Sequence, residues 1–324
     1  MKAMVYTKTG GLDVLKIMEL PKPVPKDNQV LISVKAAALN VADSEKFKSL
    51  DKTVPISTRI MNIIMGFKGA PIGAEIAGIV ECVGKNVSGL KKGDKVFGKT
   101  AGLFPKGAFA EYALMDKERV CIMPDNYTFE EAACVSISFE TALAALRKAN
   151  IKKDSQVMVY GSSGGVGLFT VQIAKAMGGI VTGVCSTRNI DIAKEYGCAS
   201  VIDYKKEDFT KTTQKYDAII GVNGCNDMST YHKLLKDDGI FVGVGNGKQA
   251  LKALFKSFIS SQFTFVAGMV NMEKGYLQYA KELAEKEQLK PYMDKVYSVS
   301  DTQNAIKYMV TSHAQGKIVV KMDF

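Results

Sequence analysis

Short apolar runs separated by glycine and proline fill the first part of the chain, from residue 1 to about residue 123. The runs Val30–Val34, Ala77–Val80 and Lys95–Phe97 have the length and composition of β-strands. Three prolines between positions 21 and 25 exclude a central strand at that point. The pattern predicts a small β-barrel or sandwich. Between residues 51 and 69 the spacing breaks down, and the sequence leaves a short helix and a flap both open.

The pattern changes after Pro124, where apolar runs begin to alternate with helical segments. Thr128 and Glu131 have the spacing of a capping box, which predicts the start of a helix. Strands and helices then alternate to about residue 268, which predicts a parallel, doubly wound sheet. The later strands of this sheet are expected at residues 201–204, 217–220, 239–245 and 263–266.

The last part of the chain mixes helix and strand patterns. An amphipathic helix is expected around residues 276–289, followed by a strand at Val296–Val299. Ser300 and Gln303 have the spacing of a second capping box and predict a further helix. A closing strand is expected at Lys317–Lys321.

The most informative stretch is the strand–turn–helix pattern around Gly161–Gly167. An apolar run, Val157–Tyr160, ends in these glycines and leads into a segment whose apolar residues recur at helical spacing. Glycines at such a turn let the backbone approach a pyrophosphate, whose negative charge faces the N–H groups of the helix start. The stretch therefore predicts a dinucleotide-binding turn, although glycines alone can also simply mark turns.

The end of the next strand, Gly179–Cys185, predicts which dinucleotide is bound. NAD-preferring sites carry an acidic residue there that binds the ribose 2′-hydroxyl, but no Asp or Glu occurs between Asp154 and Asp191. The run Ser186–Asn189 instead offers hydroxyl groups and the Arg188 guanidinium, which suit a 2′-phosphate. The sequence thus favours NADPH over NADH.

Length and composition narrow the class of protein. A chain of 324 residues usually forms two domains. The net charge of +10 comes from lysines interleaved with acids, without a basic stripe that would indicate nucleic-acid binding. The six cysteines form no Cys-x-x-Cys pair and indicate reduced thiols. No signal-peptide pattern and no apolar run of about 18 residues occurs, so we expect a soluble, cytoplasmic protein that does not enter a membrane.

Several short motifs occur in a fixed order along almost the whole chain. They are Leu39–Asp43, Pro71–Gly78, Gly93–Gly98, Gly107–Tyr112, Gly164–Gly167, Val201–Tyr204 and Gly316–Val320. Together they resemble the medium-chain dehydrogenase/reductase superfamily, and within it the zinc-independent quinone-oxidoreductase branch. The resemblance implies an α/β fold with a GroES-like, β-rich substrate domain at residues 1–123 and 269–324. Residues 124–268 would form the Rossmann domain that binds NADPH.

The residue types at three positions argue against a catalytic zinc. Such a zinc needs Cys and His ligands with one open position. In the pattern of the zinc-dependent branch the ligands would fall near Asn40, at Ala74 and near Ile137, and none of these residues is a zinc ligand. The cysteine-rich stretch of a structural zinc is also missing, so no metal site is expected. Short-chain reductases are excluded because none of the 13 tyrosines has a lysine four residues later.

The resemblance assigns roles to individual residues. Asn40 and Asp43 would lie beside the nicotinamide and the substrate, although they could also form an ordinary turn at a strand end. Lys317 would lie near the cleft, although it could be a surface lysine. The cofactor would be bound by Asn40, Thr141, Ser162, Gly164, Gly165, Val166, Ser186, Arg188, Asn189, Tyr204, Val222, Gly243, Val244, Gly245, Phe265 and Lys317.

The sequence as a whole predicts a zinc-independent oxidoreductase that passes a hydride from NADPH to a quinone or an α,β-unsaturated carbonyl. No dedicated acid is evident, so water or a hydroxyl group would protonate the product. The alternatives are a non-catalytic, crystallin-like NADPH-binding protein and, more remotely, an NAD(P)-dependent alcohol dehydrogenase. A homodimer is also expected, because Phe263–Ala267 is an apolar, β-prone run suited to pairing at a sheet edge.

Overall fold

The computed structural model describes residues 1–7, 11–43, 69–100, 107–222, 226–245, 248–266, 275–312 and 314–324. The expectation of a helix or flap at residues 51–69 therefore falls almost entirely outside the described residues, as do His313 and Cys225. The described chain forms two compact units. The first comprises residues 1–137, 277–281 and 291–324, and the second comprises residues 138–276 and 282–290.

The first unit is built on an antiparallel sheet with one parallel pair at its edge. Its strand order is β14-β15-β3-β4-β5-β7, and β6 pairs with β3 outside this path. The strands and helices of this unit are β1 (Lys2–Tyr6), β2 (Leu15–Glu19), β3 (Gln29–Leu39), β4 (Glu75–Val83), β5 (Lys95–Lys99), β6 (Tyr112–Asp116), β7 (Val120–Ile122), α3 (Phe129–Ala133), β14 (Met293–Ser298), α10 (Thr302–Thr311) and β15 (Lys317–Lys321). These strands confirm the predicted GroES-like, β-rich fold.

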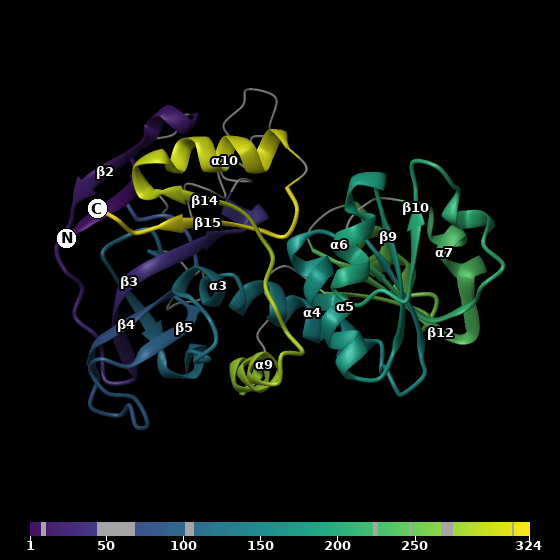
Figure 1. Ribbon diagram of the computed structural model, residues 1–324, viewed down its shortest axis with the longest axis horizontal. Coiled ribbons are helices and arrows are strands. Elements are labelled where there is room, and N and C mark those ends of the chain that lie inside the picture. The colour runs from purple at the N-terminus through teal and green to yellow at the C-terminus, as the bar shows by residue number, and fades with distance from the viewer. Residues whose placement is uncertain are drawn as a thin grey trace. The chain divides into compact units, whose positions relative to one another are not determined.

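The core of this unit lies under helix α10, which runs over β14 and β15 (Figure 1). Alternate apolar residues of β3, among them Val30 and Ile32, pack there with Ile306 of the helix and with Met115. Helix α3 packs on β3 and β4. It begins with the predicted capping box, in which the Thr128 hydroxyl accepts from the Glu131 N–H at 3.2 Å.

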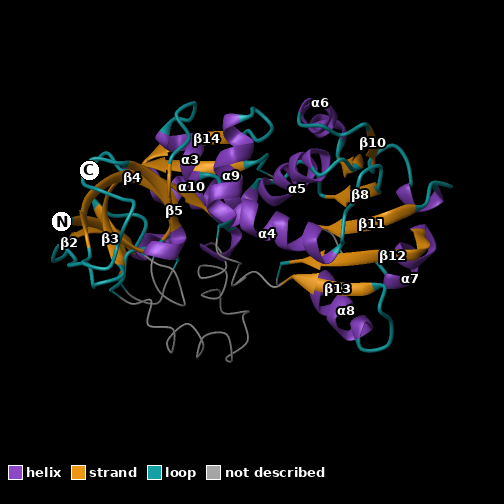
Figure 2. Cartoon of the chain, turned by 90° about the horizontal axis from the view of Figure 1, so that it is seen from below, coloured by secondary structure: helices purple, strands orange, loops and turns teal. Residues whose placement is uncertain are grey.

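The second unit contains the predicted parallel sheet. Its six described strands run in the order β10-β9-β8-β11-β12-β13, and every pair is parallel. In Figure 2, β11, β12 and β13 lie side by side with α8 next to β13. The elements are α4 (Ser136–Lys148), β8 (Gln156–Tyr160), α5 (Gly165–Ala176), β9 (Ile180–Cys185), α6 (Ile190–Glu195), β10 (Ser200–Asp203), β11 (Tyr216–Gly221), α7 (Met228–Leu234), β12 (Leu235–Val244), α8 (Lys248–Ser257) and β13 (Phe263–Val266). Helix α9 (Tyr276–Glu285) has residues in each of the two units.

This strand order reverses direction between β8 and β11, as in a doubly wound dinucleotide-binding sheet. The chain moves outward from β8 to β10 on one side and from β11 to β13 on the other, so a crevice is expected at the carboxyl ends of β8 and β11. The sheet is stabilised by an aromatic cluster, in which the rings of Tyr231 and Phe241 stack with centroids 4.3 Å apart. The predicted Rossmann fold is confirmed.

The second predicted capping box is wrong. Helix α10 begins at Thr302, and its N-cap residue Asp301 makes no side-chain cap. A short 3-10 turn precedes the helix and occupies Ser300, whose N–H donates to the Ser298 hydroxyl at 3.4 Å. The Gln303 amide reaches instead to the backbone carbonyl of Leu15, at 3.1 Å. A contact with a residue far away in the sequence has therefore replaced the local capping contact.

No helix in the described ranges combines the length and the apolar composition needed to cross a lipid bilayer. The described cysteines are free thiols, and Cys134, Cys185 and Cys198 are buried. Burial raises the pKa of the Cys198 thiol to about 12, which keeps this thiol protonated and unreactive near neutral pH.

Candidate active site

The predicted cofactor residues of the second unit gather at one edge of its sheet. Because all described strands are parallel, their carboxyl ends meet at that edge. The residues that end or follow these strands there are Ser162, Gly164, Gly165, Val166, Ser186, Arg188, Asn189, Tyr204, Val222, Gly243, Val244, Gly245 and Phe265. Thr141 lies within α4 and is buried.

The glycine-rich turn has the geometry that a diphosphate needs. Gly161 has a φ of 84°, a conformation that favours glycine, and a Cβ at Gly167 would lie 2.0 Å from the Gly161 carbonyl oxygen. A Cβ at Gly164 would meet only open space, apart from that carbonyl oxygen at 3.8 Å. Gly164 is the N-cap of α5, and no side chain caps this helix. The first N–H groups of α5 are thus left for an anion, which fits a dinucleotide diphosphate.

The turn after β9 is held to the glycine-rich turn by hydrogen bonds. The buried Asn189 amide donates to the Ser163 hydroxyl at 2.8 Å and to the Ser186 hydroxyl at 3.2 Å. Ser162 is also buried, and its hydroxyl donates to the Val184 carbonyl at 3.4 Å. Arg188 is exposed. In this arrangement Asn189 braces the turn, whereas Ser186 and Arg188 remain the predicted phosphate-binding residues.

Sequence reasoning missed a carboxylate at this edge of the sheet. Asp203 ends β10, paired with Cys185 at the end of β9. Its two carboxylate oxygens accept from the Thr187 hydroxyl at 2.6 Å and from the Lys205 N–H at 3.0 Å. The Thr187 hydrogen bond lowers the pKa of Asp203. The acid comes from the neighbouring strand, so a search of the residues that follow β9 could not find it.

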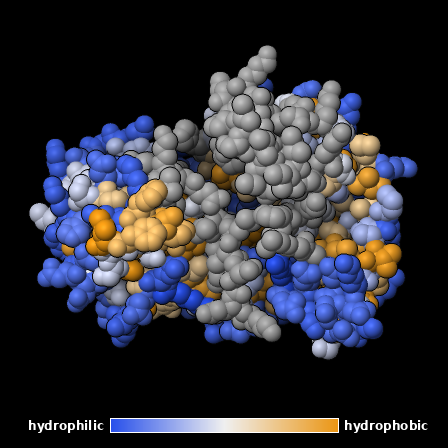
Figure 3. Space-filling view, turned by 180° about the vertical axis from the view of Figure 1, so that it is seen from behind, coloured by the Kyte–Doolittle hydropathy of each residue, from blue (hydrophilic) through white to orange (hydrophobic). Residues whose placement is uncertain are grey.

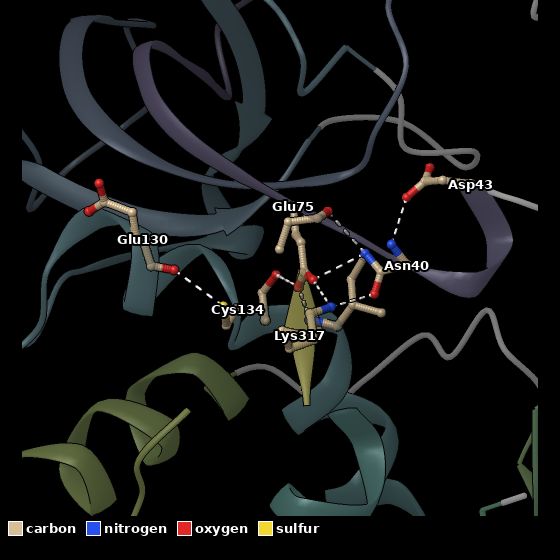
Figure 4. A network of polar contacts seen from close by, with 9 residues as sticks. Asn40, Asp43, Glu75, Glu130, Cys134 and Lys317 are labelled. Atoms are coloured by element: carbon tan, nitrogen blue, oxygen red, sulfur yellow. Dashed lines mark hydrogen bonds and ion pairs between the residues drawn. The ribbon is translucent and has the colours of Figure 1, made fainter. Parts of the chain in front are cut away.

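A buried polar cluster lies at one end of the sheet in the first unit (Figure 4). Its centre is Glu75, the first residue of β4, which has no exposed surface. One carboxylate oxygen accepts from the Ser136 hydroxyl at 3.1 Å and from the Ile137 N–H at 2.8 Å. The other accepts from the Asn40 amide at 3.1 Å and from the Lys317 ammonium. These partners satisfy the buried carboxylate in place of water.

Lys317 and Asn40 complete this cluster. Lys317 begins β15, and its side chain is only 5% exposed. Its ammonium forms an ion pair with Glu75 and donates to the Asn40 side-chain oxygen at 2.8 Å. Lys317 is therefore not a surface lysine. The Asn40 side chain is held by both partners, since its nitrogen faces Glu75 and its oxygen faces Lys317.

Asp43 stands beside this cluster and is joined to it through the backbone. Its carboxylate accepts from the Asn40 N–H at 2.9 Å, and the Asp43 N–H donates to the Asn40 carbonyl at 2.8 Å. This is the turn at the strand end that the sequence left open for Asn40 and Asp43. The same turn places the buried Asp43 carboxylate next to Asn40 (Figure 4).

Glu75 and Ser136 are members of this cluster that the predicted site did not contain. A signal was present in the sequence, because Glu75 is an acid at the start of the otherwise apolar run of β4. A buried acid needs a partner. Lys317 is likewise a charged residue at a buried position of β15, but the sequence alone does not say that the two charges meet.

The three positions where zinc-dependent relatives would place ligands lie around Glu75. Asn40 and Ile137 both donate to the Glu75 carboxylate, and Ala74 directly precedes it in the chain. None of the three side chains is a metal ligand. Across the described part of the chain, no group of three His, Cys, Asp or Glu side chains has an arrangement that could hold a metal ion.

Comparison with known proteins places the chain in a family. The model of the alcohol dehydrogenase GroES-like domain matches residues 26–125, and the model described as zinc-binding dehydrogenase matches residues 196–320. A 2-methylene-furan-3-one reductase of Solanum lycopersicum is 32% identical over 99% of this chain and 79% of its own length. A chloroplastic NADPH-dependent alkenal/one oxidoreductase of Arabidopsis thaliana is 31% identical over the same shares.

The structure of the quinone oxidoreductase from Coxiella burnetii superposes with a TM-score of 0.85. It shares 26% identity over 99% of this chain and 98% of the other. The matches extend over nearly the whole chain and agree with the GroES-like sheet and the Rossmann sheet described above. The chain therefore belongs to the medium-chain dehydrogenase/reductase superfamily, as an oxidoreductase related to the quinone oxidoreductases and alkenal/one reductases.

Proposed function

We propose that this protein is an NADPH-dependent, zinc-independent reductase that passes a hydride to a quinone or an α,β-unsaturated carbonyl. The observation that carries the proposal is the buried cluster of Asn40, Glu75 and Lys317. An ammonium group and an amide stand there among the positions where zinc-dependent relatives would hold their metal. Electron-poor acceptors need less polarisation than simple ketones, so they suit a site of this kind.

Features of the second unit support NADPH as the cofactor. The uncapped start of α5 and the open space above Gly164 suit a diphosphate, and a reduced nicotinamide supplies a hydride when bound. Asn189 holds the turn that carries Ser186 and Arg188, and these two residues would bind the 2′-phosphate. The names of the relatives agree, since one of them is an NADPH-dependent alkenal/one oxidoreductase.

The chain's own contribution is to orient the reactants and exclude water. The turn at Asn40 and Asp43 is held by two backbone hydrogen bonds. Glu75, with its partners from β3, β15 and the start of α4, keeps Asn40 in one orientation. Such preorganisation contributes to rate by holding the donor and acceptor at reacting distance.

The deciding experiment is NADPH oxidation by the purified protein with a panel of 1,4-quinones, 2-alkenals and cyclic enones. We expect turnover that depends on the acceptor and persists after dialysis against a chelator. Tight NADPH binding without turnover on any acceptor would favour a protein that only binds NADPH. Stoichiometric zinc together with oxidation of simple alcohols would overturn the proposal in favour of an alcohol dehydrogenase.

We also propose that the protein forms a homodimer through the edge of the Rossmann sheet. β13 is the last of the described strands at that edge, and Phe255, Phe258 and Ile259 near it are 66%, 76% and 74% exposed. Figure 3 shows apolar side chains gathered in a patch on the face of this unit. A strand at the edge of the described sheet, beside exposed apolar side chains, is a site for pairing with a second copy.

The test is sedimentation of the wild type and of Phe258→Asp at micromolar concentration. The wild type should sediment with the mass of two chains. The variant should shift toward the mass of one chain with an unchanged far-UV spectrum, because a buried carboxylate would disfavour the contact. A wild-type mass of one chain would exclude the dimer.

A further inference from the structure

Lys317 has one N–H donor without an acceptor among the described residues. An ammonium group has three donors. Two of them meet Asn40 and Glu75, and across the described residues the side chain has no third acceptor. With the side chain only 5% exposed, bulk water has little access to the third donor. A buried donor without a partner is costly, so its presence needs an explanation.

The donors of Asn40, Ser136 and Ile137 in this cluster are already used by described residues. The Asn40 nitrogen directs its hydrogens at Glu75, at 3.1 Å, and at the Ala38 carbonyl, at 3.5 Å. The Ser136 hydroxyl and the Ile137 N–H both donate to Glu75. Lys317 is therefore the donor in this cluster that can meet the oxygen of a bound molecule.

The position of this donor matches the place where an acceptor is expected. Lys317 donates to Asn40, and Asn40 forms the turn with Asp43 that the family resemblance puts beside the nicotinamide and the substrate. Glu75 balances the charge of Lys317, so an uncharged quinone or enal meets a neutral ion pair. Once the acceptor oxygen becomes negative, its hydrogen bond from the ammonium strengthens, and this difference lowers the barrier.

We propose that Lys317 is a catalytic residue whose third N–H contacts the acceptor oxygen and protonates it. This inference rests on the proposed function. When the β-carbon of an enal takes the hydride, the double bond shifts and the carbonyl oxygen gains the negative charge of an enolate. Lys317 gives its proton to this oxygen and forms an enol, and water that enters as the product leaves returns a proton to the amine. The enol becomes the saturated aldehyde as its α-carbon takes a proton from water and its oxygen releases one.

The test compares Lys317→Met with Lys321→Met on two acceptors, a 2-alkenal and a 1,4-quinone. Lys321 lies on the same strand and forms its own ion pair with Glu130 at 2.9 Å, but it is 51% exposed and outside the cluster. A 1,4-quinone accepts hydride more readily than an enal, so less negative charge develops on its oxygen in the transition state. The alkenal therefore depends more on the donor. We expect Lys317→Met to lower kcat/KM for the alkenal by about 10²- to 10³-fold. The loss for the quinone should be at least about tenfold smaller, and Lys321→Met should leave both values unchanged.

Removal of Lys317 leaves the Glu75 charge buried, so a loss of folding must be separated from a loss of chemistry. The double variant Lys317→Met with Glu75→Gln removes both charges and should show the same selective loss, with a thermal midpoint that shows a folded protein. Equal losses on both acceptors, or no loss, would overturn the role of Lys317 while the proposed function stands. A wild type that reduces neither acceptor would overturn the proposed function, and this role with it.

Discussion

Replacing Arg188 with glutamate is the most direct test of the cofactor preference. Arg188 lies exposed in the turn after β9, next to Ser186, whose hydroxyl is held by Asn189 at 3.2 Å. If its guanidinium binds the 2′-phosphate, the substitution removes a charge-assisted hydrogen bond and adds a negative charge near the phosphate. The Asp203 carboxylate already lies at this edge of the sheet, where it accepts from the Thr187 hydroxyl at 2.6 Å. A second carboxylate there would increase the repulsion of the 2′-phosphate.

The expected loss of kcat/KM for NADPH in Arg188→Glu can be estimated from the exposure of Arg188. An exposed contact falls at the low end for hydrogen bonds to charged groups, about 1.5 kcal/mol, and a like charge about 4 Å away in water costs about 1 kcal/mol more. Together these effects amount to about 2.5 kcal/mol, or about 70-fold in kcat/KM for NADPH. Use of NADH should change little or improve, because a glutamate can accept from a free 2′-hydroxyl.

The assay is kcat/KM for NADPH and for NADH, measured at one ionic strength with a single acceptor. Lys194→Glu is the matched control, since it makes the same change of charge on the exposed side of α6. We expect the control to alter the NADPH/NADH ratio by less than about threefold. An unchanged ratio in Arg188→Glu, or an equal change in the control, would refute phosphate binding by Arg188.

Two further predictions concern the glycine-rich turn and the acid at the end of β10. Gly167→Ala should lower the melting temperature and weaken NADPH binding together, because its Cβ would lie 2.0 Å from a backbone oxygen. Gly164→Ala should fold normally but weaken NADPH binding, since its Cβ enters open space. Calorimetry and fluorescence titration separate the two, and a normal melting temperature for Gly167→Ala would contradict the packing argument. Because the pKa of Asp203 is lowered on folding, its stabilising effect is complete well above pH 4 and is lost as the pH falls through the folded value. We expect the free energy of unfolding, measured with urea, to fall less between pH 7 and pH 3 in Thr187→Val than in the wild type. An equal fall in both proteins would show that the Thr187 hydrogen bond does not lower the pKa of Asp203.

Much of the fold could be read from local patterns. The strand–turn–helix unit at Gly161–Gly167, the capping box at Thr128 and the closing strand at Lys317–Lys321 all lie where the sequence predicts them. Each depends on contacts between residues close in sequence or on the period of apolar positions, and such signals survive without knowledge of the tertiary structure. Where a distant partner competes, as Leu15 does for Gln303, the local rule fails.

The candidate site likewise contains parts that the sequence predicts and parts that only the tertiary structure brings together. The turn from Asn40 to Asp43 spans four residues, and the run Ser186–Asn189 follows one strand, so both could be proposed from the sequence. The cluster around Glu75 joins residues 35 and 242 positions apart, and the sequence does not state which buried acid meets which buried amine. The pairing of the strands decides which acid meets which amine. β15 and β4 both lie against β3 in the sheet, so Lys317 and Glu75 meet at the end of β3, where burial requires each charge to have the other as its partner.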